Sequence, residues 1–211
     1  MRQRIMWLVS WCVFVSAALG VSAEKRNSVD CSKKPLADAV RDVTDANVTI
    51  SFTGVCTGPV VVAIDGLTLQ GVGTAVIDGG GENAVTIAGA SRIALIDIDV
   101  TNGGNGIVVR DGAHVTLSGV TSHHNSGSGI VFRNASTGTL TDVVASNNSI
   151  GLAADNGVGI TVQGATVTNN TARDIQLTFG TRADMSQLTF GTYSCDATVL
   201  VRGSGGITCP H

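Results

Sequence analysis

Two histidines stand side by side at His123 and His124, and two arginines, Arg110 and Arg133, occupy matching positions in neighbouring segments. An imidazole can take up or release a proton near neutral pH, so the histidine pair is a candidate general acid or base. Guanidinium groups bind carboxylates and sulfates through paired hydrogen bonds. Together these four residues could hold an acidic substrate and remove a proton from it.

Each group also has a simpler interpretation. Asp111 and Asp155 could neutralise the two arginines in a solvated column that binds no ligand. The histidines could decorate a turn, or form half of a metal site. The corresponding positions of the neighbouring segments offer only Ser, Thr and Asn, which are weak ligands, so no metal is expected.

His114 and Asp142 complete the set of candidate substrate-binding residues. We expect His114 to share an outward column with Ser91 and Ser136. Asp142 matches Asp97 two segments earlier, and at a rise of about 4.8 Å per segment their carboxylates lie about 10 Å apart, too far to share one calcium ion. Calcium has no support from this spacing, and no cofactor is expected.

An internal repeat predicts the elements that position these residues. Asparagine recurs with steps of 23, 23 and 22 residues, at Asn102, Asn125, Asn148 and Asn170. Repeats of this length predict a solenoid, and segment 106–120 alternates apolar and polar residues as a β-strand does. Stacked amides of these asparagines could form a hydrogen-bonded ladder. The sequence therefore predicts an all-β parallel solenoid of about six or seven coils, each rising about 4.8 Å.

The ends of the predicted solenoid need covers, because an open β edge invites aggregation. A one-faced helix over 34–43, capped by Ser32, is expected at the N-terminal end, after loose residues 24–34. The stretch 192–210 breaks the repeat and is expected to form a C-terminal cap. We place the coils at 59–82, 83–104, 105–128, 129–150 and 151–171, with a degenerate coil at about 172–195. The alternation predicts these inward residues: Ile87, Ile93, Leu95, Ile107, Val109, Val115, Leu117, Ile130, Phe132, Leu140, Ile160 and Val162.

The first residues read as a secretory signal peptide, because 1–23 combines a basic start, an apolar run and a small-residue cleavage site. The rest divides into an N-terminal segment with the capping helix, 24–45, and the solenoid with its C-terminal cap, 46–211. A secreted or periplasmic protein is expected, with no membrane span. Four cysteines remain, and an even number in an exported chain favours disulfides. Proximity favours Cys31–Cys56 and Cys195–Cys209 over the two other pairings.

Removing residues 1–23 changes the formal net charge from −3 to −5, because Arg2 and Arg4 are lost. No basic cluster remains, so nucleic acid is not an expected partner. Both tryptophans, Trp7 and Trp11, also lie in this segment. A sugar-binding platform of several exposed aromatic rings is therefore excluded for the mature chain.

Two stretches of the chain carry a family resemblance. VTLSGVTSHHNSGSGIVFRNASTGTLTDVVASNNSIGLA (115–153) resembles the right-handed parallel β-helix repeats of the pectate-lyase-like superfamily, and CTGPVVVAIDGLTLQGVGTAVIDG (56–79) resembles the first coils of secreted bacterial members. The resemblance covers roughly 46–190 and implies a right-handed parallel β-helix. The same repeats serve lyases, hydrolases, epimerases and non-catalytic surface proteins.

The resemblance implies a polysaccharide partner but not a particular reaction. The NTD, DD, GHG and RIK blocks of polygalacturonases and the DPH block of alginate epimerases are missing. We expect a secreted protein that binds or acts on acidic polysaccharide along its outer face. If it is an enzyme of the lyase, epimerase or glycosidase kind, Arg110 and Arg133 would neutralise a carboxylate and His123 or His124 would abstract the neighbouring proton. The alternatives are a non-catalytic cell-surface or periplasmic interaction module and a small-molecule enzyme.

Overall fold

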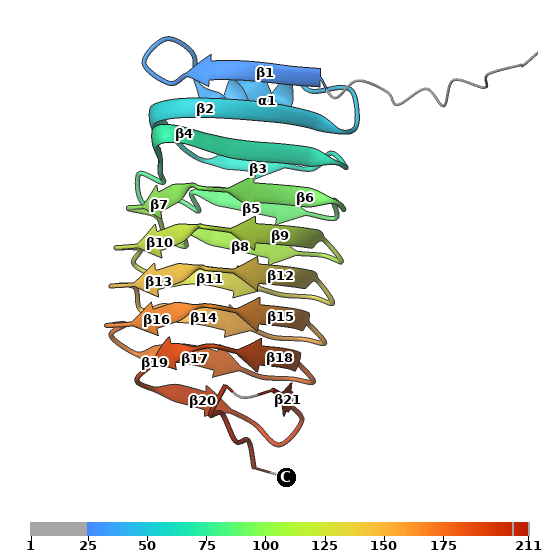
Figure 1. Cartoon of the computed structure of the whole chain (residues 1–211), viewed down its shortest axis with the longest axis vertical. Coiled ribbons are helices and arrows are strands. Elements are labelled where there is room, and N and C mark those ends of the chain that lie inside the picture. Colours follow the sequence, from blue (N-terminus) through green and yellow to red (C-terminus); the bar gives the residue numbers. More distant parts are fainter. Residues whose placement is uncertain (1–24, 204, 211) are drawn as a thin grey trace, which may run out of the picture.

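The chain folds into a rod of stacked parallel coils (Figure 1). The computed structural model describes residues 25–203 and 205–210, and the predicted signal peptide at 1–23 lies outside them. A typical coil contributes three short strands, which gives the rod three long sides, here called face 1, face 2 and face 3. Each strand pairs in parallel with the strands of the coils above and below. The prediction of an all-β parallel β-helix is therefore confirmed.

The strands fall into two sheets. Faces 2 and 3 belong to one fourteen-stranded sheet, because the long strand β4 spans both sides, and face 1 is a separate seven-stranded sheet. Face 1 contains β3 (Val60–Val62), β5 (Val85–Ala88), β8 (Ile107–Arg110), β11 (Ser128–Phe132), β14 (Ile150–Ala154), β17 (Arg173–Leu177) and β20 (Tyr193–Cys195). Face 2 contains β6 (Ile93–Ile96), β9 (His114–Ser118), β12 (Thr137–Thr141), β15 (Gly159–Gln163), β18 (Arg182–Ser186) and β21 (Leu200–Arg202). Face 3 contains β7 (Asp99–Thr101), β10 (Thr121–His123), β13 (Val144–Ser146), β16 (Thr166–Thr168) and β19 (Thr189–Phe190). The first elements are β1 (Lys25–Asp30), α1 (Leu36–Arg41), β2 (Val48–Thr57) and β4 (Leu67–Asp78).

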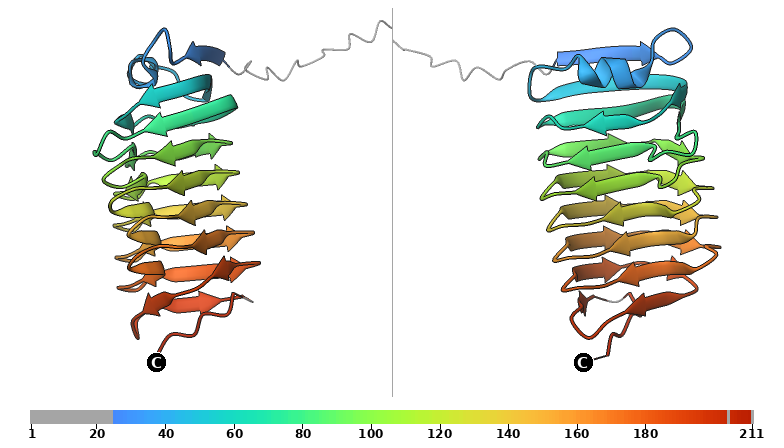
Figure 2. Two further views of the ribbon diagram at one scale, coloured as in Figure 1. Left: turned by 90° about the vertical axis from the view of Figure 1, so that its left-hand side faces the viewer. Right: turned by 180° about the vertical axis from the view of Figure 1, so that it is seen from behind.

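The N-terminal end is closed by β1 and α1 (Figure 2). The helix buries Leu36 and Val40 as predicted, but it begins after Pro35 without a side-chain cap. Ser32, the expected cap, instead donates from Oγ to Asp30. The expectation of loose residues at 24–34 is wrong over β1, because that strand pairs in register with β2.

The chain makes about eight turns, slightly more than the six or seven predicted. Face 1 has a strand from each of seven turns, and α1 takes the place of a face 1 strand between β1 and β2. At the other end, β20 and β21 continue the pairing with β17 and β18, although their sequence no longer repeats. Backbone pairing therefore extends further than the side-chain pattern indicates.

The two disulfides form as predicted, one at each end of the rod. Cys31 and Cys56 have their Cα atoms 5.0 Å apart, and Cys195 and Cys209 have theirs 5.5 Å apart. The first bridge joins the segment after β1 to β2. The second joins β20 to the C-terminal tail, so both end layers are covalently tied to the coils beneath them.

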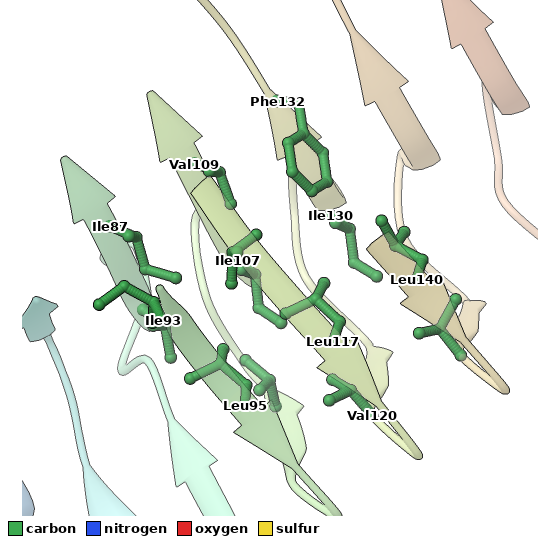
Figure 3. Packing of buried hydrophobic residues seen from close by; sticks show 14 of the residues in the cluster. Ile87, Ile93, Leu95, Ile107, Val109, Leu117, Val120, Ile130, Phe132 and Leu140 are labelled. Atoms are coloured by element: carbon green, nitrogen blue, oxygen red, sulfur yellow. The ribbon is translucent and has the colours of Figure 1, made fainter. Parts of the chain in front are cut away.

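Apolar side chains from all three faces meet along the axis of the rod (Figure 3). Every residue predicted to point inward is buried, with Ile160 the most exposed of them at 4%. The same inward positions recur in successive coils, so each side chain packs on its counterparts above and below. The core is thus a continuous apolar column rather than a set of separate clusters.

A ladder of buried asparagines lines the corner where face 3 turns into face 1. Nδ2 of Asn125 donates to Oδ1 of Asn148 (2.9 Å), and Nδ2 of Asn148 donates to Oδ1 of Asn170 (3.2 Å). The same two oxygens accept the backbone N–H of the preceding asparagine. Asn125 is 3% exposed and Asn148 is 2% exposed, so these amides satisfy groups that water cannot reach.

The prediction that Asn102 is the fourth member of the ladder is wrong by one residue. Thr101 pairs with His123, which places Gly103 opposite Asn125. The N–H of Gly103 donates to Oδ1 of Asn125, and this bond ends the ladder on its N-terminal side. Asn102 instead has a positive φ of 55° and donates from Nδ2 to Asp78.

The ladder ends on a buried carboxylate at its C-terminal side. Oδ1 of Asp174 accepts from Nδ2 of Asn170 (2.9 Å), and Oδ2 accepts from the backbone N–H groups of Gly191 and Thr192 (2.8 Å each). Burial would raise the pKa of Asp174, but the hydrogen bonds from Asn170, Thr192 and Gly191 outweigh it and hold the pKa below its ordinary value.

We expect Asp174→Ala to lower the free energy of unfolding by about 1.5–3 kcal/mol at pH 7, because charge-assisted hydrogen bonds are lost and their donors stay buried. Since the folded-state pKa is lowered, this contribution is complete above the unfolded pKa of about 4 and disappears as the pH falls further. Urea denaturation at several pH values measures it. Asp42→Ala, which removes an exposed ion pair with Lys34, is the control and should cost less than about 1 kcal/mol.

We expect Gly129→Ala to destabilise the protein by about 1–3 kcal/mol through overpacking of the ladder. A Cβ at Gly129 would lie 2.5 Å from Nδ2 of Asn148 and 3.0 Å from the carbonyl oxygen of Gly151. Gly159→Ala is the matched control, because a Cβ there meets only Cγ2 of Thr137, at 3.5 Å. Equal melting temperatures for the two variants would contradict the proposed role of Gly129.

Candidate functional site

His123 and His124 form a cluster with Asp99 at the corner between face 3 and face 1. Nε2 of His123 lies 2.8 Å from Oδ1 of Asp99 on the preceding coil, and the two Nδ1 atoms of His123 and His124 lie 2.6 Å apart. Thr101 Oγ1 is 3.3 Å from the same Nδ1 of His123. The two imidazoles meet edge to face, at an interplanar angle of 88°. His124 has a positive φ of 53°, like Asn102 before it in this column.

The arrangement favours one pattern of protons. A nitrogen facing a carboxylate is more stable with a proton than with a lone pair, so Nε2 of His123 should carry one. The N–H does not point directly at Asp99, whose buried Oδ1 has no hydrogen-bond partner among the described residues, so the contact is an electrostatic pairing. Neutral His123 then accepts at Nδ1, and His124 donates from its own Nδ1. The lone pair left on Nε2 of His124, an exposed residue, is the available base.

The surroundings of this cluster are acidic. Asp97 and Asp99 line a shallow depression of about 280 Å³ on the face 3 side. In the described part of the chain, no group of three or more His, Cys, Asp or Glu side chains is arranged to hold a metal ion. The arrangement of the two imidazoles and the Asp99 carboxylate is suited to proton transfer.

Arg110 and Arg133 lie on adjacent coils in register, as predicted, at the corner between face 1 and face 2. Asp155 follows them in the same column. Arg110 donates from Nη1 to Oδ2 of Asp111, and Nε of Arg133 lies 3.6 Å from Oδ2 of Asp155. Both arginines thus have the acidic partners that the simpler interpretation expected, Asp111 and Asp155, although the ion pair between Arg133 and Asp155 is long.

The predicted site residues lie at three different corners. His114 begins face 2 just past Arg110, and its Nδ1 is 2.6 Å from Oγ1 of Thr137. Asp142 has a positive φ of 51° and lies at the corner between face 2 and face 3. The histidine pair lies at the third corner, across face 1 from the arginines. The five residues of β11 span about 16 Å at 3.3 Å each, so one small substrate cannot contact both groups.

The prediction that Ser91 and Ser136 flank His114 in its column is wrong by one residue. Thr137 pairs with His114 on one side, and the pairing of Ile93 with Val115 places Arg92 opposite His114 on the other. Ser136, the predicted neighbour, is fully buried and donates from Oγ to the carbonyl oxygen of Val109. The strand of face 2 begins one residue later than the sequence pattern indicates.

Face 1 carries a small cleft that the sequence did not indicate. The cleft has a volume of about 110 Å³ and lies across β11, β14 and β17. Arg133 and Asp155 line one part of it, Ala153 another, and Gln176 and Thr178 extend it to the next coil. Oδ1 of Asp155 is buried there without a hydrogen-bond partner. Beside the cleft, Val108 and Val131 point outward as predicted but are buried in a small apolar cluster of their own.

Comparison with known proteins places this fold in a family. The sequence model of the right-handed β-helix region matches residues 49–207, about three quarters of the chain. The chain belongs to the right-handed β-helix family. No curated protein matches this β-helix chain.

Solved structures of carbohydrate-active enzymes share the fold. The alginate lyase from Paenibacillus sp. str. FPU-7 superposes with a TM-score of 0.69 at 15% identity, over 85% of this chain and 69% of that enzyme. The pectate lyase Pel9A gives 0.63 at 14% identity, over 78% of this chain and 54% of that enzyme. The A-module of the mannuronan C-5 epimerase AlgE6 from Azotobacter vinelandii gives 0.50 at 12%, over 78% and 61%. This chain therefore spans little more than half of the pectate lyase. At these identities the comparisons show the shared fold.

The proton pattern of the histidine cluster is directly measurable. We expect His124 to be the Nδ1–H tautomer and His123 the Nε2–H tautomer in the neutral state. Long-range nitrogen–proton NMR spectra at high pH distinguish the two forms. Asp99→Ala should release His123 from its tautomer, because the carboxylate that favours Nε2–H is gone. Identical spectra for Asp99→Ala and the parent protein would contradict the cluster.

Proposed function

We propose that this protein binds acidic polysaccharide, with the cleft on face 1 receiving one sugar unit of the chain. The observation that carries the proposal is the composition of the cleft. Arg133 supplies a cation, Asp155, Gln176 and Thr178 supply hydrogen-bonding groups, and Ala153 supplies an apolar surface. Carbohydrates need this mixture, because each sugar presents hydroxyls around its edge and C–H groups on its ring face.

Two details of the cleft support a ligand role. The terminal Nη groups of Arg133 have no hydrogen-bond partner within residues 25–203 and 205–210, and the contact of Arg133 with Asp155 runs from Nε, at 3.6 Å. They are free to bind a carboxylate in a bidentate manner. The buried Oδ1 of Asp155 lacks a donor, and a sugar hydroxyl could supply it. A hydrogen bond to such a charged group contributes about 1.5–3 kcal/mol.

The polymeric nature of the ligand agrees with the spacing of the candidate residues. The arginine corner and the histidine corner are separated by the width of face 1, about 16 Å for five strand residues. A polysaccharide crossing face 1 could contact both corners through different sugar units. The fold shared with alginate and pectate lyases supports an acidic polymer as the ligand class.

We further propose that the protein acts outside the cytoplasm, either secreted or in a periplasm. Two disulfides tie its ends, and such bonds persist in oxidising compartments. The sequence of residues 1–23 has the features of a secretory signal. No helix among the described residues is long and apolar enough to cross a membrane.

We expect Arg133→Ala to weaken binding of pectate or alginate oligosaccharides roughly tenfold, as loss of a contact worth about 1.5 kcal/mol or more requires. The effect should shrink at high salt, and neutral oligosaccharides should be unaffected. Calorimetric titration of both proteins measures this. Arg92→Ala is the control, because Arg92 forms a comparable exposed pair with Asp65 and does not line the cleft. Equal losses for the two variants would mean that the effect is one of overall charge.

The Asp99–His123–His124 cluster favours a second candidate function, cleavage or epimerisation of the bound polymer. The free Nε2 of His124 could abstract a proton while Asp99 stabilises the charge gained by the pair. Incubating the protein with pectate and alginate, and following unsaturated products and new reducing ends, tests for cleavage. Activity that is lost in His124→Ala while binding persists would support the enzyme. Binding without any product in the parent protein would leave the binding function alone.

A further inference from the structure

A second depression, larger than the face 1 cleft, lies on face 2 near the C-terminal end of the rod. It has a volume of about 540 Å³ and spans β15, β18 and β21. Ligand-binding pockets commonly have volumes of about 300–1,000 Å³. Its outward side chains belong to Thr161, Arg182, Asp184, Leu200 and Arg202, and Gly159 lies on its floor. None of these residues belongs to the face 1 cleft or to the histidine cluster.

The depression is hollow because Gly159 has no side chain. The pairing of β9, β12, β15, β18 and β21 places His114, Thr137, Gly159, Arg182 and Leu200 in one outward column. Glycine interrupts this column between two larger side chains. The next outward column contains Thr161, then Asp184, then Arg202.

Neither the backbone nor the packing requires glycine at this position. Gly159 is not among the residues with positive φ, so an L-residue could adopt its conformation without strain. A Cβ would meet only Cγ2 of Thr137, at 3.5 Å, which is a normal contact. Glycine within a strand weakens it through the extra freedom of the unfolded chain. Stability therefore gives no reason for the hollow.

The two arginines beside the hollow have no acidic partner among the described residues. Arg92, Arg110 and Arg133 each have an acidic partner. By contrast, neither Arg182 nor Arg202 has an ion pair in the part of the chain that the structure describes, although Asp184 stands opposite Arg202. Arg182 and Arg202 lie on adjacent strands two residues out of step, which separates their Cα atoms by about 8 Å. Two guanidinium groups can converge on one anion from that distance.

We propose that the face 2 depression binds an oxyanion-bearing sugar unit, either carboxylated or sulfated. Arg182 and Arg202 hold the oxyanion. Thr161 and Asp184 form hydrogen bonds with the hydroxyl groups of the sugar, and Leu200 contacts the apolar face of its ring. The empty position above Gly159 is the space that the ring occupies. The site rests on the proposed function only for the class of ligand, since its residues and its face are different.

The test uses Gly159→Thr, which gives β15 the residue that β12 has at the same position, Thr137. We expect its melting temperature to equal or exceed that of the parent protein, because the strand gains a β-branched residue whose Cβ meets no atom closer than 3.5 Å. We expect its affinity for oligogalacturonate or for a heparin oligosaccharide, whichever the parent protein binds, to fall at least tenfold, because the threonine side chain fills the floor of the depression. The double variant Arg182→Gln/Arg202→Gln should lose affinity to a similar degree and keep its stability. Arg92→Gln is the matched arginine control.

The probes are oligogalacturonate for a carboxylated sugar, a heparin oligosaccharide for a sulfated one, and a cello-oligosaccharide as the neutral control, each titrated calorimetrically. The acidic probe whose binding Gly159→Thr weakens at least tenfold identifies the oxyanion. If the Gly159 and double-arginine variants bind both acidic probes as tightly as the parent, this site is refuted, whatever Arg133→Ala does. If Arg133→Ala binds normally while Gly159→Thr does not, the face 1 proposal fails and this site stands. If neither acidic probe binds the parent, both proposals fail.

Discussion

Hydrogen bonding between successive coils is the constraint on which this structure depends. A coil has no internal partner for its backbone groups, so each strand must find them one layer above and one layer below. Register is then fixed for every outward column at once, since a slip by one residue would turn the apolar positions to solvent. The asparagine ladder fixes the same register at a corner, where strand pairing is interrupted. Arg110 and Arg133 lie one above the other because these two kinds of hydrogen bond leave them no other arrangement.

The sequence predicted the interior well and the corners poorly. Inward residues such as Leu95 and Phe132 follow a period of two, which survives small errors in coil length. Corner residues depend on where a strand stops, and coils of 22 and 23 residues shift that point. Asn102 shares the side-chain type of the ladder but lies one position before it, in the left-handed conformation that asparagine tolerates. The pairing of β1 with β2 could not be predicted either, because β1 has no counterpart in the repeat.

For the candidate sites, the sequence identified the reactive side chains but not the residues that contact them. The stacking of Arg110, Arg133 and Asp155 was predictable from the repeat, and the structure bears it out. The partnership of His123 with Asp99 was not, because Asp99 lies on the preceding strand, two residues before the position opposite His123. The face 2 hollow was within reach of sequence reasoning once β12 and β15 were aligned, since glycine replaces a β-branched residue at the first position of the strand. The missing information was the register, which only the three-dimensional pairing supplies.

The amide ladder has a direction and an end of its own within the rod. Nδ2 of each asparagine donates a hydrogen bond toward the C-terminal end of the rod. The last of these bonds goes to Asp174, whose ionised carboxylate can only accept. A duplicated coil of 22 or 23 residues inserted between Asn125 and Asn148 would continue the series unchanged. The coil after Asp174 donates to the carboxylate through the backbone N–H groups of Gly191 and Thr192 instead of through an asparagine. The ladder is therefore open to growth between its asparagines and stops at the carboxylate, beyond which the rod continues by strand pairing.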